Sequence, residues 1–177
     1  ADRRVEFIHA SLAPLDEALA ALGRAHGHDG VRLLVRHDHA VAEIDRLARE
    51  LHVQAVYANH DDEPAALQRD AQVRGLLARH GIALHTSKDH VVFERKEVLS
   101  AAGAPYSVFT PYRNAWLKKL EPFFLEAYPV EKHAAALAPV PEAIATQMPT
   151  LESLGFRRSN LHELKIPVGW PGARTLL

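Results

Sequence analysis

Near the start of the chain, apolar residues recur every three or four positions. They fall at Ile8, Leu12, Leu15, Leu19 and Leu22. This spacing places the side chains on one face of a helix. Gly23 follows directly, and glycine often ends helices because it tolerates a positive φ. The pattern predicts a helix that begins near Val5 and ends at Gly23.

Two short apolar runs follow, with a helical period between them. The runs "VRLLVRH" and "VQAVYAN" occupy residues 31–37 and 53–59. Both are rich in β-branched residues and have little alternation, which is typical of parallel strands covered on both faces. Residues 41–51 carry apolar positions at helical spacing, so the three segments predict a β-α-β unit.

A further helix and strand are predicted after residue 60. The segment 61–81 opens with acidic residues and Pro64 and closes at Gly81, as helices commonly do. Its core positions are expected to be Leu67, Val73, Leu76 and Leu77. "IALHT", residues 82–86, predicts a third strand. Strands alternating with helices predict an α/β fold: a Rossmann-like parallel sheet with flanking helices.

The pattern changes after Thr86. "VVF" at residues 91–93 predicts a short strand, and a longer helix is expected with Thr110 as its cap and Pro111 in its first turn. Its buried stripe is expected to be Leu117, Leu120 and Phe124. Prolines then recur at positions 129, 139, 141, 149, 167 and 171, a spacing that prevents long helices. We therefore expect an α/β domain over residues 1–127 and a linker over residues 128–177.

Composition excludes several classes of protein. Lys and Arg number 21 against 22 Asp and Glu, so the formal charge is -1 and no global positive field draws the chain to nucleic acid. The chain has no cysteine, which excludes disulfides, thiolate metal sites and a cysteine nucleophile. No apolar run approaches a membrane span, and the charged first residues lack a signal-peptide core. We expect a cytosolic protein without membrane contact.

Polar residues follow the first two predicted strands. Arg36, His37, Asp38 and His39 end one, and Asn59, His60, Asp61, Asp62 and Glu63 end the other. Ligands of open α/β sheets bind at the carboxyl ends of strands, so these clusters are the candidate site. The alternative is that Asp38, Asp62 and Glu63 serve only as helix caps.

A metal site is a rival interpretation of the same clusters. The side chains that could bind zinc, iron or manganese are those of His37, His39, His60, Asp61 and Glu63. Alternate strand residues point to opposite faces, however, and 12 histidines make some clustering expected by chance. The glycine-rich nucleotide loops, the G-x-S-x-G elbow and H-E-x-x-H are missing. We expect no metal ligand and rank a metal-dependent hydrolase last.

A basic and aromatic stretch, "FTPYRNAWLKKL", holds Tyr112, Arg113, Trp116, Lys118 and Lys119. At helical spacing, Tyr112, Trp116 and Lys119 lie on one face of the helix. The bland interpretation is an amphipathic helix with a packed aromatic side and solvated cations. The alternative is a surface that contacts another domain or DNA phosphates locally, for which Tyr112, Arg113, Trp116 and Lys118 are the candidates.

Longer blocks of the chain resemble the DNA photolyase and cryptochrome family. They read "FIHASLAPLDEALAALG", "LLVRHD", "AVYANHDDEPAALQRDAQVRGLLARHGIALHT", "KDHVVFERKEVLSAAGAPYSVFTPYRNAWLKKL" and "LESLGF". The blocks keep the family's order and spacing over nearly the whole chain. The resemblance is greater to the cyclobutane pyrimidine dimer photolyases than to eukaryotic cryptochromes.

The resemblance implies an N-terminal antenna domain. In the family this α/β domain precedes a linker and a helical domain, where light-excited reduced FAD donates an electron to a pyrimidine dimer flipped out of DNA. We expect the flavin, the damaged DNA and the catalytic residues to belong to a parent protein, in which the FAD domain follows in cis. The chain alone is expected to repair nothing. A cryptochrome-like photoreceptor is the alternative.

The resemblance also indicates an antenna site. Asp61 and Glu63 match positions that approach a deazaflavin antenna in the family, and Arg36 and Asn59 lie at the same predicted strand ends. The folate pattern has an Asn-Glu pair where this chain has Ala65 and Ala66, so a deazaflavin-like antenna is favoured. Because the family's first two strands have no counterpart before Ala1, we expect no chromophore bound to the chain, and either a rearranged sheet or a strand-mediated homodimer.

Overall fold

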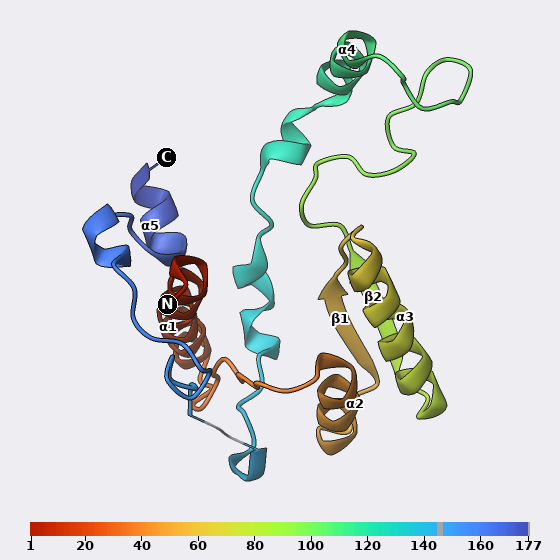
Figure 1. Ribbon diagram of the computed structural model, residues 1–177. Helices are drawn as coiled ribbons and strands as arrows, with labels where there is room; N and C mark the ends of the chain where they lie inside the picture. Colours follow the sequence, from red (N-terminus) through yellow and green to blue (C-terminus); the bar gives the residue numbers. More distant parts are fainter. Residues whose placement is uncertain (145–146, 177) are drawn as a thin grey trace. The chain divides into compact units, whose positions relative to one another are not determined.

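The computed structural model describes residues 1–144 and 147–176. The chain divides into two compact units. The sheet unit comprises residues 38–128, and the terminal unit comprises residues 1–37 together with residues 129–177. Figure 1 labels their helices and strands. No helix in the described part of the chain combines the length and the apolar character needed to span a bilayer.

The sheet unit is built on two parallel strands. Strand β1 (Ala55–Asn59) pairs with β2 (Ala83–Ser87), in a register that runs from Ala55 opposite Ala83 to Asn59 opposite Ser87. Helix α3 (Pro64–Arg79) connects them, and α2 (Ala40–Glu50) precedes β1 and packs against α3. The arrangement confirms the predicted α/β class, a parallel sheet with flanking helices.

The core of this unit lies between the helices and one face of the sheet. Its buried members are Ala48, Val73, Leu77 and Ile82, and Val41, Ile44, Val53, Val56 and Leu84 pack around them. Two of the four core positions predicted for α3 are therefore correct. Leu76 is half-buried, and the prediction for Leu67 is wrong because 44% of its surface is exposed.

The predicted strand over residues 31–37 is not formed. This segment is irregular and belongs to the terminal unit, where it follows α1 (Arg3–Ala25). The Leu33 N–H donates to Asp16 Oδ1 of α1 at 2.8 Å, and the Gly30 carbonyl accepts from the Val140 N–H at 3.0 Å. A strand needs a neighbouring strand for its backbone groups, and here the Leu33 N–H bonds to a helix side chain instead.

Three predictions beyond β2 are also wrong. Residues 91–93 form part of a loop, not a strand. Helix α4 (Phe109–Lys119) begins after Val108, which makes no side-chain cap bond, so Thr110 lies inside the helix. Its expected apolar stripe is not buried: Leu117 is 47% exposed, while Leu120 and Phe124 are half-buried. The reason is that α4 packs through Trp116, as described below.

The terminal unit joins both ends of the chain. Helix α1 starts at its cap Asp2, whose carboxylate accepts from the Arg4 N–H at 2.8 Å, and it continues two residues beyond Gly23. Helix α5 (Gly169–Leu176) packs against α1 (Figure 1). The connecting chain holds short 3-10 helices over residues 130–136, 142–144 and 161–164, as expected from its prolines.

Candidate functional site

The candidate site lies at the carboxyl edge of the two-stranded sheet. Asn59 is the last residue of β1 and is exposed. The next residue, His60, extends the ladder by donating its backbone N–H to the Ser87 carbonyl at 2.9 Å. The chain then turns through residues 60–63 into α3. This is the edge at which parallel sheets bind ligands.

The turn presents two carboxylates to solvent. Asp61 Oδ1 accepts a hydrogen bond from the Glu63 N–H at 3.0 Å, which fixes the shape of the turn, and 42% of the Asp61 side chain remains exposed. Glu63 is the residue before α3, but its side chain makes no capping bond. The capping interpretation therefore does not describe the Glu63 side chain. The amide of Asn59 and the carboxylates of Asp61 and Glu63 offer several hydrogen-bond acceptors.

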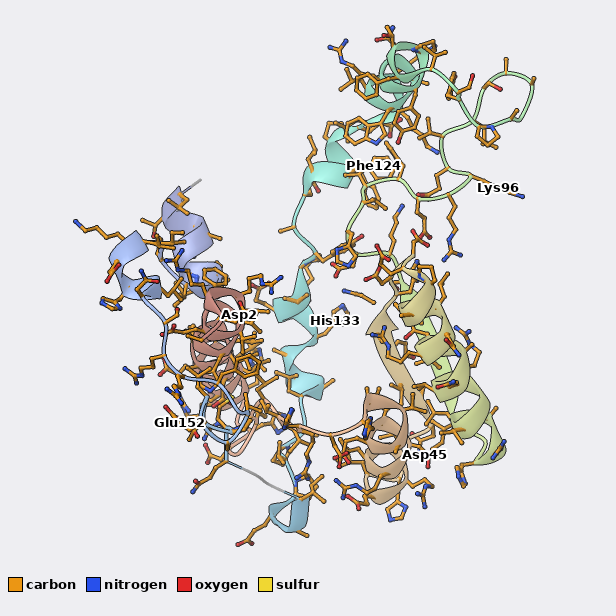
Figure 2. All side chains as sticks on the ribbon, in the orientation of Figure 1. Asp2, Asp45, Lys96, Phe124, His133 and Glu152 are labelled. Carbon is orange, nitrogen blue, oxygen red and sulfur yellow. The ribbon has the colours of Figure 1, made fainter. Side chains whose placement is uncertain are left out.

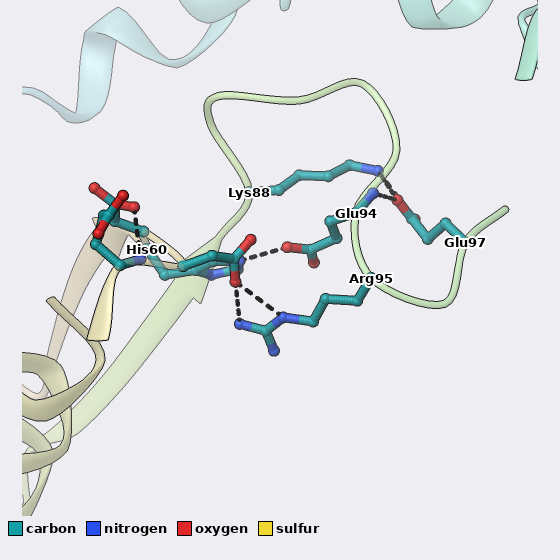
Figure 3. A network of polar contacts seen from close by, with 8 residues as sticks. His60, Lys88, Glu94, Arg95 and Glu97 are labelled. Carbon is teal, nitrogen blue, oxygen red and sulfur yellow. Dashed lines mark hydrogen bonds and ion pairs between the residues drawn. The ribbon is translucent and has the colours of Figure 1, made fainter. Parts of the chain in front are cut away.

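A loop over residues 88–98 is tied to this turn by charged side chains (Figure 3). The His60 Nε2 and Glu94 Oε2 atoms are 2.6 Å apart, and their side chains are only 15% and 22% exposed. Arg95 contacts the Asp62 carboxylate at 3.1 Å. Asp62 therefore forms an ion pair and is not a simple helix cap. Pairs with little exposure are screened less by salt than surface pairs.

Glu97 holds the loop itself in shape. Its carboxylate accepts from Lys88 Nζ at 2.7 Å and from the Glu94 N–H at 2.7 Å (Figure 3). The hydrogen bond from Lys88, followed by the one from the Glu94 backbone, lowers the pKa of Glu97 below its ordinary value. The Glu97 carboxyl therefore stays ionised to a lower pH than an ordinary glutamate does.

An aromatic cluster anchors the same loop. The Phe93 ring is 6% exposed and meets the rings of Trp116 and Phe124 edge-on, at centroid distances of 5.6 and 4.8 Å. Lys119 lies over Phe93, 4.9 Å from the centroid, and donates to the Glu97 carbonyl. Edge-to-face rings and a cation over a ring are both favourable geometries. They attach α4 to the loop.

Arg36, the fourth predicted antenna residue, belongs to the terminal unit. Its Nη2 donates to the Ile144 carbonyl at 2.6 Å. Its side chain lines an apolar cavity of about 200 Å³ together with His9 and His37. Of the four predicted residues, Asn59, Asp61 and Glu63 thus belong to the sheet unit, and Arg36 belongs to the terminal unit.

The predicted docking residues of α4 have different surroundings. Trp116 is half-buried against Phe93, and Tyr112 is half-buried with its ring 6.2 Å from that of Tyr106. Arg113 and Lys118 are exposed. This is the amphipathic arrangement that the bland interpretation describes. Whether the two exposed cations contact a domain or DNA stays a prediction.

The rival metal site has no geometric support. Among residues 1–144 and 147–176, no three His, Asp or Glu side chains are grouped as metal ligands. His37 and His39 fall in different units. Asp38 accepts from the His39 N–H at 2.7 Å just before α2, which is a local backbone contact.

Sequence reasoning missed Lys88, Glu94, Arg95 and Glu97. Their charges were visible in "KDHVVFERKE", but charged loops are usually only solvated. The link from His60 to Glu94 spans 34 residues, and such a separation has no periodic signature. The available signal was the short distance along the chain between β2 and these charges.

Comparison with known proteins identifies the family. The model of the DNA photolyase family matches residues 1–139. Deoxyribodipyrimidine photo-lyases from Synechococcus and Halobacterium salinarum are 33% and 32% identical over 83% and 91% of the chain. That of Escherichia coli is 30% identical over 78% of it. The chain spans 31%, 32% and 29% of these relatives, about a third of their length.

A solved structure has a similar fold. A bacterial class III photolyase from Agrobacterium tumefaciens superposes on 65% of this chain with a TM-score of 0.52 and 23% identity, and the match covers 22% of that structure. At this identity the likeness concerns the fold alone. The family model, however, covers well over half of the sequence. The chain therefore belongs to the DNA photolyase family.

Proposed function

We propose that this chain is the light-harvesting part of a deoxyribodipyrimidine photo-lyase. The family match over residues 1–139 supports the assignment. The observation that carries the site is the grouping of Asn59, Asp61 and Glu63 at the carboxyl edge of β1. The relatives are about three times as long, so the repair of ultraviolet-induced pyrimidine dimers by electron transfer from reduced FAD is proposed for a parent protein. We propose no catalytic residue in this chain, and we place the binding of FAD and damaged DNA in the parent protein.

The antenna site would take a deazaflavin-like ring. The acceptors of Asp61, Glu63 and Asn59 suit a heteroaromatic edge that carries N–H and O–H donors. When bound, such a chromophore absorbs near-ultraviolet and blue light and passes the excitation to the flavin. Ala65 and Ala66 stand where the folate-using pattern has an Asn-Glu pair, and methyl groups cannot replace those polar contacts. This difference favours a deazaflavin over a folate.

The rest of the proposal concerns organisation. Residues 1–127 would form the antenna domain and residues 128–177 the linker to an FAD domain in cis. The α4 residues Tyr112, Arg113, Trp116 and Lys118 would face that domain or DNA, in the cytosol. A strand-mediated homodimer also belongs to the proposal, because β1 and β2 pair only with each other in the described part of the chain and open edges invite pairing.

A titration tests the antenna site. The chain, which is expected to purify without chromophore, is titrated with a deazaflavin and, separately, with methenyltetrahydrofolate while absorption and fluorescence are followed. We expect saturable deazaflavin binding that is weakened in the Asp61→Asn, Glu63→Gln double variant. The matched control is Glu17→Gln with Asp29→Asn, two exposed carboxylates of the terminal unit. Equal binding by both double variants would contradict the site.

A second assay separates repair from signalling. The parent protein that contains this chain is illuminated with DNA that carries pyrimidine dimers, and the dimers are counted. Light-dependent splitting is expected for the photo-lyase. If the parent binds flavin but leaves the dimers intact, the cryptochrome-like alternative is correct, although nothing in the comparisons favours that alternative or a hydrolase.

A further inference from the structure

The segment 59–63 divides its side chains between two surroundings. His60 and Asp62 are held by the 88–98 loop, through Glu94 at 2.6 Å and Arg95 at 3.1 Å. The other three, at positions 59, 61 and 63, are the proposed antenna ligands. The held and the presented residues alternate along the chain.

The charges of the turn explain why it needs partners. Asp61, Asp62 and Glu63 place three carboxylates in consecutive positions, and like charges at short range repel. Arg95 supplies the permanent cation that offsets the middle carboxylate. His90 approaches Asp61 at 3.9 Å, a longer contact whose side chains are 68% and 42% exposed. The Arg95–Asp62 pair is also exposed, at 55% and 60%, so the contacts to residues 60 and 62 hold the turn together with the Glu63 N–H bond to Asp61.

Packing and backbone conformation keep the 88–98 loop next to the turn. Phe93 is buried beneath α4 immediately before Glu94, so the loop cannot drift from the sheet without exposing an aromatic ring. Arg95 has φ of 46°, a left-handed conformation that is unfavourable for a residue with a β-carbon. Backbone strain of this kind persists only where surrounding contacts enforce it, and it concentrates at functional sites.

We propose that Glu94 and Arg95 are positioning residues for the antenna site: by holding His60 and Asp62 they turn Asn59, Asp61 and Glu63 toward the ligand. The inference rests on the proposed function, because it names residues that serve the same site. Glu94 acts through His60, and Arg95 acts through Asp62. Neither is expected to touch the chromophore.

The test uses two substitutions in the intact chain, Glu94→Gln and Arg95→Gln, which remove a charge with little change of size. Lys96→Gln is the matched control, because Lys96 lies in the same loop and projects into solvent (Figure 2). The Glu94→Asp variant keeps a carboxylate and is expected to restore part of any loss. Circular dichroism establishes that each variant is folded.

Two readouts are taken on each variant. The first needs no ligand: NMR signals of the backbone amides at positions 59–63 and of the His60 imidazole should shift in Glu94→Gln and Arg95→Gln but not in Lys96→Gln. The second is the deazaflavin titration, in which the dissociation constant should rise about tenfold in Glu94→Gln, as the loss of one partly buried charged hydrogen bond implies. The rise should be smaller in Arg95→Gln, because the side chains of Arg95 and Asp62 are 55% and 60% exposed.

The outcomes separate this inference from the proposed function. If the unsubstituted chain binds deazaflavin and the Gln variants bind it equally well, the inference is overturned and the function stands. If the unsubstituted chain binds no chromophore, the proposed function fails. The NMR signals then decide the inference alone: a rearranged turn in both Gln variants supports positioning, and an unchanged turn overturns it.

Discussion

Val31 occupies the space that a side chain at position 23 would need. A β-carbon added to Gly23 would lie 2.6 Å from both Cβ and Cγ2 of Val31 and 2.9 Å from the His28 carbonyl oxygen. Val31 is 4% exposed, so neither it nor the backbone can move aside freely. Gly23→Ala is therefore expected to destabilise the chain by about 1–3 kcal/mol, the range for overpacking, in urea unfolding.

The matched control is Gly75→Ala in α3. Apart from the adjacent residues and the helix's own backbone, no atom lies within 4 Å of a β-carbon at this position, so only the helix preference changes, and alanine should stabilise by up to about 1 kcal/mol. Opposite signs at the two glycines would establish steric overlap as the cause. Partial recovery in Gly23→Ala, Val31→Ala would assign the overlap to Val31, and a stabilised Gly23→Ala would contradict the packing.

Asp16 ties the segment after α1 to the helix. It accepts from the Leu33 N–H at 2.8 Å and from Arg32 Nε at 2.9 Å. Its side chain is 13% exposed, whereas that of Arg32 is 61% exposed. Most of the stabilisation should therefore come from the backbone hydrogen bond, because the exposed partner is screened by water.

We expect Asp16→Ala to cost about 2 kcal/mol and to speed hydrogen exchange at the Leu33 amide. Asp16→Asn keeps an acceptor and should cost less than half as much. Arg32→Gln should cost under about 1 kcal/mol. If Arg32→Gln proved as damaging as Asp16→Ala, the ion pair and not the backbone bond would be the main contact.

Glu97 predicts an acid-sensitive loop. Its pKa is lowered by the hydrogen bond from Lys88 and then by that from the Glu94 N–H. A lowered folded-state pKa stabilises the fold above the unfolded value of about 4.3, and this stabilisation is lost as the pH falls through the folded value. The loop should therefore loosen below about pH 4.3, and Trp116, which lies against Phe93, should report it by fluorescence.

The measurement is made with Trp170→Phe, so that Trp116 is the single indole that emits. Glu97→Gln should abolish the acid transition of Trp116 and leave the signal closer to its low-pH value at neutral pH. Because the Glu97 side chain is 40% exposed, we expect under about 1 kcal/mol of global stability. A transition that persists in Glu97→Gln would assign the acid response to another carboxylate.

The elements that local pattern predicted well are those whose partners lie close in sequence. β1, α3 and β2 are consecutive and form their own small core around Leu77, so propensity and packing agree. The run at residues 31–37 has equally strong strand character, yet no strand pairs with it within the described residues. Strand propensity describes fit to a sheet and cannot supply the neighbour.

The site was predictable to the same extent. Asn59 ends a strand, and Asp61 and Glu63 follow it directly. Because ligands of parallel sheets bind at the carboxyl ends of strands, these residues could be predicted as a site. Arg36 was placed with them because its own run was expected to be a strand. The contacts of Glu94 and Arg95 were not predicted, because they depend on the path of an irregular loop back to the sheet edge. The burial of Phe93, one residue before Glu94, fixes that path.

Phe93 should therefore control the loop and α4 without controlling the sheet. In the sheet unit, α2 packs on α3 and α3 packs on β2, whereas Phe93 joins the loop to Trp116 and Phe124. Phe93→Ala removes a buried ring, a change that typically costs about 3–5 kcal/mol. We expect this cost to appear as local opening.

Hydrogen exchange distinguishes local from global loss. In Phe93→Ala, amides of α4 and of the 88–98 loop should lose protection by a factor of a hundred or more, since about 2.7 kcal/mol corresponds to that ratio. Amides of β1, β2 and α3 should keep theirs, because their core residues Val73 and Leu77 are untouched. Phe93→Leu, which keeps an apolar side chain, should lose less. Equal loss of protection in β1 and α4 would show that the loop and the sheet unfold together.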